Sequence, residues 1–156
     1  MLPVAARVLE LLERSELSLA VAESLTGGLL VAELVAVPGA SRVVRGGVVA
    51  YATDLKHSLL GVDAGVLAAH GAVTGDVARQ MAEGVCQRLD AEVGVATTGV
   101  AGPDSQDGRE PGTVFLAVHR EGAGTRTEEH AFAGDRAAVQ DASVRAALAL
   151  LEEVLR

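Results

Sequence analysis

The stretch Ala20-Val21-Ala22-Glu23-Ser24-Leu25-Thr26-Gly27-Gly28, followed by Leu29-Leu30-Val31, decides how the chain is expected to fold. Its small apolar residues predict a buried strand, its hydroxyl- and glycine-rich centre a turn, and the second apolar run the start of a helix. Glycine costs about 1 kcal/mol against alanine in a helix, so two glycines in a first turn indicate that backbone N–H groups approach a ligand. Such a turn can hold an anion, or an oxyanion beside a nucleophilic Ser24. Helix capping by Ser24 or Thr26 is the simpler alternative, and from the turn alone it ranks first.

Length and composition place the chain among single-domain globular proteins. Its 156 residues, 49% of them hydrophobic, are enough for one well-packed domain over 1–156. The net charge is -8 and the arginines do not cluster, which argues against nucleic-acid binding and favours a small polar ligand. No run approaches the roughly 20 apolar residues of a membrane helix, and the N-terminal segment has the pattern of an amphipathic helix rather than a signal peptide. We therefore expect a cytoplasmic protein without membrane association.

Two residue types that bear on chemistry occur once each. Cys86 has no His or Cys partner at metal-ligand spacing, so we expect no disulfide, no metal and no cofactor, with the thiol packed in a helix. Of the 13 basic residues, Lys56 is the only lysine. A desolvated lysine can lose its proton and arginine in practice cannot, so the sharper hypothesis is acid–base work by Lys56, and a tolerated surface residue is the simpler one.

Strand-like and helix-like segments alternate along the rest of the chain. The pattern predicts an α/β fold, a three-layer α/β/α sandwich with a mixed sheet of about five strands, one of them antiparallel because the last two strands form a hairpin. Strands are expected near 20–23, 45–51, 92–98, 113–118 and 125–132, and helices near 5–14, 29–37, 53–60, 63–70, 74–89 and 135–155.

Four turns beyond strand ends carry chemically equipped residues, and sites in such sheets lie where these turns converge. The turns follow Glu23, Tyr51 and Thr98 or lie at Gly134-Asp135. The loop over 99–112 is long enough to indicate a function, but it matches neither a calcium loop nor a phosphate-binding P-loop. Arg136 is the favoured anion ligand of the last helix because it lies in the first turn.

Five motifs stand in series along the chain, and together they resemble one known family. They are Ala22-Glu23-Ser24-x-Thr26-Gly27-Gly28, Tyr51 with Lys56, Thr98-Gly99-x-Ala101-Gly102-Pro103-Asp104, Pro111-Gly112-Thr113-Val114 and Phe132-x-Gly134-Asp135-Arg136. Over nearly its whole length the sequence resembles the C-terminal domain of the CinA family of competence/damage-inducible proteins, whose stand-alone members are nicotinamide mononucleotide amidases.

The resemblance implies hydrolysis of nicotinamide mononucleotide to nicotinic acid mononucleotide and ammonia in NAD recycling, without a metal. It implies Ser24 as the nucleophile and Lys56 as the base, with Tyr51 beside them in the catalytic group. The oxyanion and substrate ligands that it implies are Thr26, Gly27, Gly28, Thr98, Gly99, Gly102 and Arg136.

The chain departs from the family pattern in three places. Ser105-Gln106 stands where Gly-Gly is common, Glu110-Pro111-Gly112 is a shortened segment, and Gln140 stands where relatives often carry a second arginine. Two alternatives follow, a non-catalytic nucleotide-binding or regulatory module and an amidase for another small amide. The apolar stripes of the helices exceed what one small domain must bury, which predicts a homodimer.

Overall fold

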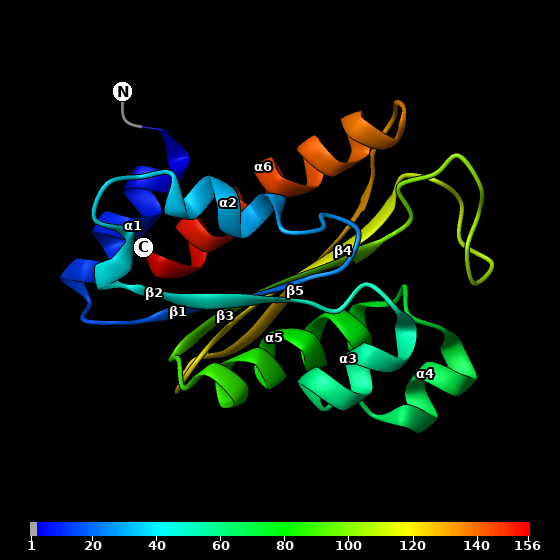
Figure 1. Cartoon of the computed structure of the whole chain (residues 1–156), viewed down its shortest axis with the longest axis horizontal. Coiled ribbons are helices and arrows are strands. Elements are labelled where there is room, and N and C mark those ends of the chain that lie inside the picture. The colour runs from blue at the N-terminus through cyan, green and yellow to red at the C-terminus, as the bar shows by residue number, and fades with distance from the viewer. Residues whose placement is uncertain (1–2) are drawn as a thin grey trace.

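A five-stranded sheet lies between two layers of helices in the computed structural model, which describes residues 3–156 (Figure 1). Met1 and Leu2, where the segment predicted to be no signal peptide begins, lie outside these residues. The strand order is β2-β1-β3-β4-β5. The strands are β1 (Leu19–Glu23), β2 (Val44–Val49), β3 (Val93–Gly99), β4 (Thr113–Arg120) and β5 (Gly124–Ala131). The helices are α1 (Val4–Arg14), α2 (Leu29–Val35), the 3-10 turn η1 (Ala40–Arg42), α3 (Thr53–Leu60), α4 (Ala64–His70), α5 (Gly75–Leu89) and α6 (Arg136–Leu155).

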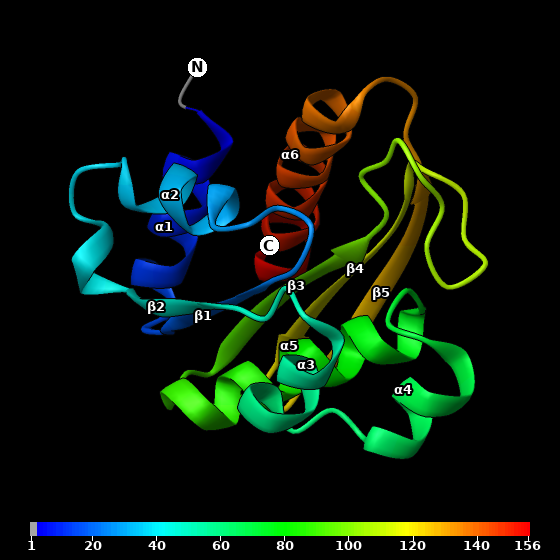
Figure 2. The same ribbon diagram turned by 45° about the vertical axis from the view of Figure 1, so that its right-hand side comes forward.

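The helices form two layers, as the alternating pattern predicts. Helices α1, α2 and α6 cover one face of the sheet, and α3, α4 and α5 lie on the other (Figures 1 and 2). Strand β1 pairs in parallel with β2 and β3, whereas β4 pairs antiparallel with both β3 and β5. The predicted three-layer sandwich with one antiparallel strand is therefore confirmed.

The two faces of the sheet differ in side-chain size, and this sets how closely the helices approach. Along β1, Val21 packs in the core under α1, α2 and α6, while Ala22 packs in the core on the α5 side. The small residues let α5 lie close to the sheet, since a Cβ added to Gly94 of β3 would stand 2.3 Å from the carbonyl oxygen of Ala82. Small residues thus hold the α5 layer against the sheet.

Side-chain caps begin α5 and α6, whereas α3 begins without one. The Thr74 side chain accepts the Val77 N–H at the start of α5, and the Asp135 side chain accepts an N–H at the start of α6. The sequence favours Thr53 or Asp54 as the cap of α3. This prediction is wrong, because α3 already begins at Thr53 and Ala52 occupies the cap position without a side-chain bond. Helix α2 ends at Val35, two residues before the predicted end.

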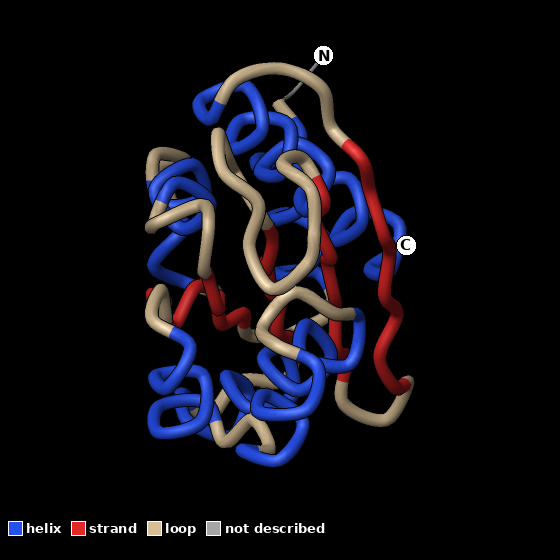
Figure 3. Tube along the Cα trace, turned by 90° about the vertical axis from the view of Figure 1, so that its right-hand side faces the viewer, coloured by secondary structure: helices blue, strands red, loops and turns tan. Residues whose placement is uncertain are grey.

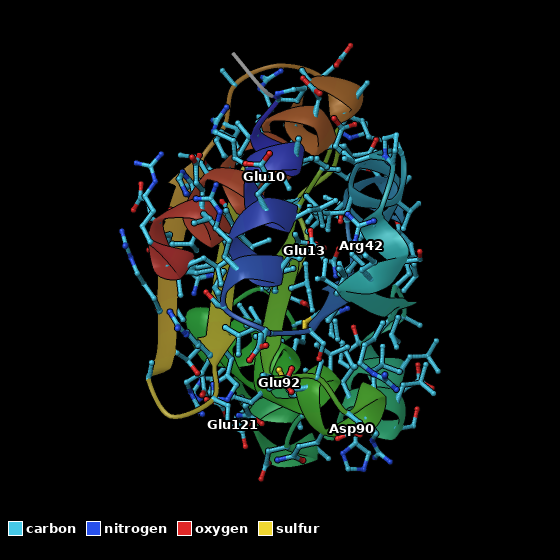
Figure 4. All side chains as sticks on the ribbon, turned by 90° about the vertical axis from the view of Figure 1, so that its left-hand side faces the viewer. Glu10, Glu13, Arg42, Asp90, Glu92 and Glu121 are labelled. Atoms are coloured by element: carbon cyan, nitrogen blue, oxygen red, sulfur yellow. The ribbon has the colours of Figure 1, made fainter. Side chains whose placement is uncertain are left out.

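The parallel strands β1, β2 and β3 point their carboxyl ends to one end of the molecule, where the long loops gather (Figure 3). Asp90, Glu92 and Glu121 lie at the opposite end (Figure 4). Across residues 3–156, no helix has the length and hydropathy of a membrane-spanning segment, and no group of three His, Cys, Asp or Glu residues could hold a metal ion.

Candidate functional site

The turn after β1 is bonded to Thr97, near the end of the neighbouring strand β3. The Ser24 N–H donates to the carbonyl oxygen of Thr97 at 3.1 Å, and the hydroxyls of Thr26 and Thr97 are 2.8 Å apart. Ser24 and Thr26 are both buried. These contacts tie the turn at Ser24 to the end of β3, so the sheet sets the position of this turn.

Glu23 occupies the N-terminus of α2. Its two carboxylate oxygens accept the N–H groups of Leu30 and Val31 at 2.9 and 3.0 Å, and its side chain is 1% exposed. The positive end of the α2 dipole is therefore met by a carboxylate of the chain itself rather than left for a bound anion. Sequence reasoning missed this role, although Glu23 stands directly before the predicted turn.

The two glycines of the turn allow its backbone to adopt positive φ angles. Gly27 and Gly28 have φ angles of +56° and +105°, in the left-handed region that favours glycine. A Cβ added to Gly27 would meet no atom within 4 Å, so close approach of another group does not explain this residue. The Gly27 N–H donates to the carbonyl oxygen of Ser24 at 3.1 Å, which leaves that donor committed to the turn. The oxyanion or substrate-binding roles expected of Thr26, Gly27 and Gly28 stay predictions.

Lys56 reaches from α3 to the Ser24 hydroxyl. Its Nζ lies 2.9 Å from Ser24 Oγ, 2.8 Å from the carbonyl oxygen of Ala50 and 3.3 Å from that of Tyr51. The side chain is 1% exposed and is the largest of the fully buried side chains among the described residues. The two residues that the resemblance pairs as nucleophile and base are thus in direct contact.

The surroundings of Lys56 favour its neutral form. Burial lowers the pKa of Lys56 from 10.5 to about 8, because the ammonium loses its hydration, while the Asp107 carboxylate acts in the opposite direction. Carbonyl oxygens only accept hydrogen bonds, so a neutral amine gives its two hydrogens to Ala50 and Tyr51 and turns its lone pair toward Ser24 Oγ. The contact geometry therefore suits a base as well as a cation.

A pocket of about 600 Å³ opens beside this pair. Arg136, in the first turn of α6, donates to the Gly102 carbonyl oxygen at 2.6 Å and to the Tyr51 hydroxyl at 2.8 Å. The pocket is lined by Ser24, Leu25, residues 51–53 and 99–106, and Arg136. The four turns singled out in the sequence meet here.

The remaining predicted site residues divide into two groups. Gly99, Gly102 and Arg136 line the pocket, and a Cβ on Gly99 would stand 2.7 Å from a backbone oxygen of Thr113. Thr98 does not line it, because its hydroxyl donates to the Ala72 carbonyl oxygen at 2.7 Å. Tyr51 is 58% exposed and meets Lys56 through its carbonyl oxygen, while its hydroxyl meets Arg136. A catalytic role for the Tyr51 hydroxyl stays a prediction, and its contacts are those of a wall of the pocket.

Gln140 connects α6 to the turn at Ser24-Leu25. Its side-chain amide donates to the Leu25 carbonyl oxygen at 2.9 Å, and Leu25 lines the pocket. Gln140 therefore supports the turn instead of presenting a second cation to the pocket. The sequence already indicates that Gln140 and Arg136 face the same side of the helix, because residues four apart share a face.

Comparison with known proteins agrees with this geometry. Residues 2–155 match the family described as the CinA C-terminal domain. The chain belongs to this CinA family. A CinA-like protein from Frankia casuarinae is 49% identical over 148 residues, which cover 95% of this chain and 34% of that protein. The chain spans about a third of the length of curated relatives that it matches.

Solved structures of the CinA family share the fold. A CinA superfamily protein from Klebsiella pneumoniae 700603 has a TM-score of 0.93 and 35% identity, covering 97% of this chain and 95% of that one. A competence/damage-inducible protein from Agrobacterium tumefaciens has a TM-score of 0.93 and 35% identity, covering 98% and 94%. The fold and the family are thereby shown.

Proposed function

We propose that the chain is an amidase that hydrolyses the carboxamide of nicotinamide mononucleotide through Ser24 and Lys56. The observation that carries the proposal is the buried 2.9 Å contact between Lys56 Nζ and Ser24 Oγ at the wall of the pocket. A serine hydroxyl becomes a useful nucleophile only beside a base, and a lysine with a lowered pKa supplies one near neutral pH.

The first half of the reaction forms an acyl-enzyme. Neutral Lys56 removes the proton from the Ser24 hydroxyl as Oγ attacks the carboxamide carbon, which produces a tetrahedral intermediate. The Lys56 ammonium then gives this proton to the leaving nitrogen, the C–N bond breaks, and ammonia departs. Lys56 can act first as the base and then as the acid because its Nζ contacts Ser24 Oγ, the atom that bonds to the carboxamide carbon.

The second half returns the enzyme to its starting state. Neutral Lys56 takes a proton from a water molecule, whose oxygen attacks the ester carbonyl. Collapse of the second tetrahedral intermediate returns that proton to Ser24 Oγ and releases the carboxylic acid, which loses its remaining proton to solvent and becomes the carboxylate product. Each proton that leaves or returns to Ser24 Oγ passes through Lys56, the only lysine of the chain.

The pocket supports a mononucleotide as the substrate class. Its volume of about 600 Å³ falls within the range of roughly 300 to 1,000 Å³ that is typical of small-molecule sites. Arg136 stands at the start of α6, where the helix dipole adds to its positive charge. The Arg136 guanidinium has five N–H donors, of which two bind Tyr51 and Gly102. The other three could donate hydrogen bonds to a phosphate.

Ammonia release from nicotinamide mononucleotide tests the proposal. We expect the wild-type protein to release ammonia and nicotinic acid mononucleotide, and Ser24→Ala to bind the substrate, as read by a thermal shift, with at least a hundred-fold lower turnover. A thermal shift of the wild type without ammonia would mean a binding module. Turnover of other small amides, but not of this one, would leave an amidase with a different substrate.

A further inference from the structure

The turn after β1 contains two backbone N–H groups without a hydrogen-bond acceptor among residues 3–156. The N–H groups of Ser24 and Gly27 donate to the carbonyl oxygens of Thr97 and Ser24. The N–H groups of Leu25 and Thr26 donate no hydrogen bond within the same residues, although Leu25 is 2% exposed and Thr26 is fully buried. Buried backbone donors are nearly always paired in folded proteins. Two unpaired donors directly after Ser24 are what a site for a ligand oxygen requires.

Both peptide units that carry these donors are held by their carbonyl groups. The Ser24 carbonyl oxygen, which belongs to the peptide unit of the Leu25 N–H, accepts the Gly27 N–H at 3.1 Å. The Leu25 carbonyl oxygen, which belongs to the peptide unit of the Thr26 N–H, accepts the Gln140 side-chain amide at 2.9 Å. It accepts no other hydrogen bond within the described part of the chain. Gln140 alone therefore fixes how the second peptide unit is turned.

The direction of the Gln140 bond turns the Thr26 N–H toward the catalytic side of the turn. The Leu25–Thr26 peptide is trans, so its N–H points opposite to its carbonyl oxygen. Helix α6, which carries Gln140, covers one face of the sheet, whereas α3, which carries Lys56, lies on the other (Figures 1 and 2). The Thr26 N–H is thus turned away from α6, toward the side from which Lys56 reaches Ser24.

We propose that Gln140 is a positioning residue of the amidase site, which holds the Leu25–Thr26 peptide so that the Leu25 and Thr26 N–H groups receive the oxyanion of the tetrahedral intermediates. The inference rests on the proposed function and deepens it, because it assigns the oxyanion donors to the two residues after Ser24. Gln140 acts through the Leu25 carbonyl oxygen and does not line the pocket itself. Donors aimed at a developing charge stabilise the transition state more than the bound substrate, so Gln140 should affect kcat rather than KM.

Gln140→Met removes the donor while keeping a neutral side chain of similar length. Removal of one oxyanion donor lowers kcat by about 10²- to 10³-fold, and here the donor is misdirected rather than removed. We therefore expect kcat for nicotinamide mononucleotide to fall about ten- to hundred-fold, with KM within about two-fold of the wild type. Gln87→Met is the matched control, because Gln87 is an exposed glutamine of α5 that lies outside this pocket and makes no side-chain hydrogen bond within residues 3–156. It should leave kcat and KM unchanged.

Gln140→Arg separates hydrogen bonding from packing. Arginine keeps N–H donors on a side chain long enough to reach the Leu25 carbonyl oxygen, so kcat should stay within about three-fold of the wild type. A role of Gln140 in packing alone predicts the reverse order of the two variants, because methionine matches glutamine in size and arginine does not.

3-Pyridylboronic acid supplies a readout that needs no turnover. Ser24 Oγ bonds to the boron, the hydroxyl proton passes to Lys56, and the boron becomes a tetrahedral anion that resembles the reaction intermediate. Titration calorimetry should show that Gln140→Met weakens boronate binding by the same factor as it lowers kcat, because both report stabilisation of the tetrahedral state. Gln87→Met and Gln140→Arg should bind the boronate about as well as the wild type.

The outcomes decide between the positioning role and its alternatives. Wild-type kcat and boronate affinity in Gln140→Met, an equal loss in Gln87→Met, or a loss that appears in KM alone would overturn the proposal. Boronate binding that depends on Gln140 in a protein that releases no ammonia from nicotinamide mononucleotide would support the positioning role and refute the proposed reaction. The two failures are therefore distinguishable.

Discussion

Replacement of Lys56 by methionine should make the stability of the protein less dependent on pH. The folded state lowers the pKa of Lys56 from 10.5 to about 8, and one pKa unit corresponds to about 1.36 kcal/mol. Burying the charged ammonium therefore destabilises the folded state by roughly 3 kcal/mol at pH 7, where lysine is largely protonated in both states. Above pH 10.5 the amine is neutral in both states, and this destabilisation is gone.

The sign follows from proton binding. Between pH 8 and pH 10.5 the unfolded chain holds a proton that the folded chain has released, so the free energy of unfolding rises with pH in this window. Relative to Lys56→Met, the wild type should gain roughly 2.5 kcal/mol of stability between pH 7 and pH 10. The carbonyl oxygens that Lys56 bonds lose their donor in the variant at every pH, which offsets the two curves without changing their slopes.

Urea unfolding of both proteins at pH 7, 8, 9 and 10 measures this difference, because all other titrating groups are shared. A difference that stays constant within about 0.5 kcal/mol, well below the 2.5 kcal/mol expected, would refute the argument. Lys56 would then keep an ordinary pKa in the folded state, and its use as a base near neutral pH would lose its physical ground.

Three further predictions concern activity and packing. Lys56→Arg should keep the charge and lower amidase turnover by about a hundred-fold or more in an ammonia assay, because guanidinium does not release its proton near neutral pH; retention of a tenth of the turnover would contradict the dyad. Arg136→Ala should raise KM about ten- to hundred-fold for the mononucleotide and little for the phosphate-free riboside, and equal changes would remove the phosphate role. Gly84→Ala should destabilise the protein by more than about 3 kcal/mol in urea, since the added Cβ would stand 1.8 Å from the Leu60 carbonyl oxygen, whereas Gly75→Ala in the same helix has room and should be nearly neutral.

The fold could be predicted because its signals are local and repeated. Small apolar strands, turn residues after them and four-residue steps of apolar side chains give the layers and the antiparallel β4. The ends of helices are harder to predict, as at α2, which ends at Val35 and not at the predicted Val37.

The site could be predicted where a rare residue or a family motif marked it, and less well where a tertiary contact decides. Lys56 was visible as the single lysine, and the structure brings it to Ser24. The role of Glu23 could not be predicted, because no local sequence pattern indicates that its carboxylate accepts backbone N–H groups in the first turn of α2. The bond from Gln140 to Leu25 could not be predicted either, since only the folded chain brings α6 to this turn. The homodimer stays a prediction.

The contacts of α6 with the pocket bear on when activity can arise as the chain is synthesised. Arg136 and Gln140 bind the segments at Tyr51, Gly102 and Leu25, all of which leave the ribosome well before the last helix. A nascent chain that lacks α6 can pair β1 with β2 and β3, yet it has neither the cation at the pocket nor the amide that supports the Ser24 turn. The proposed activity should therefore appear only once α6 has docked, and not grow in step with the sheet.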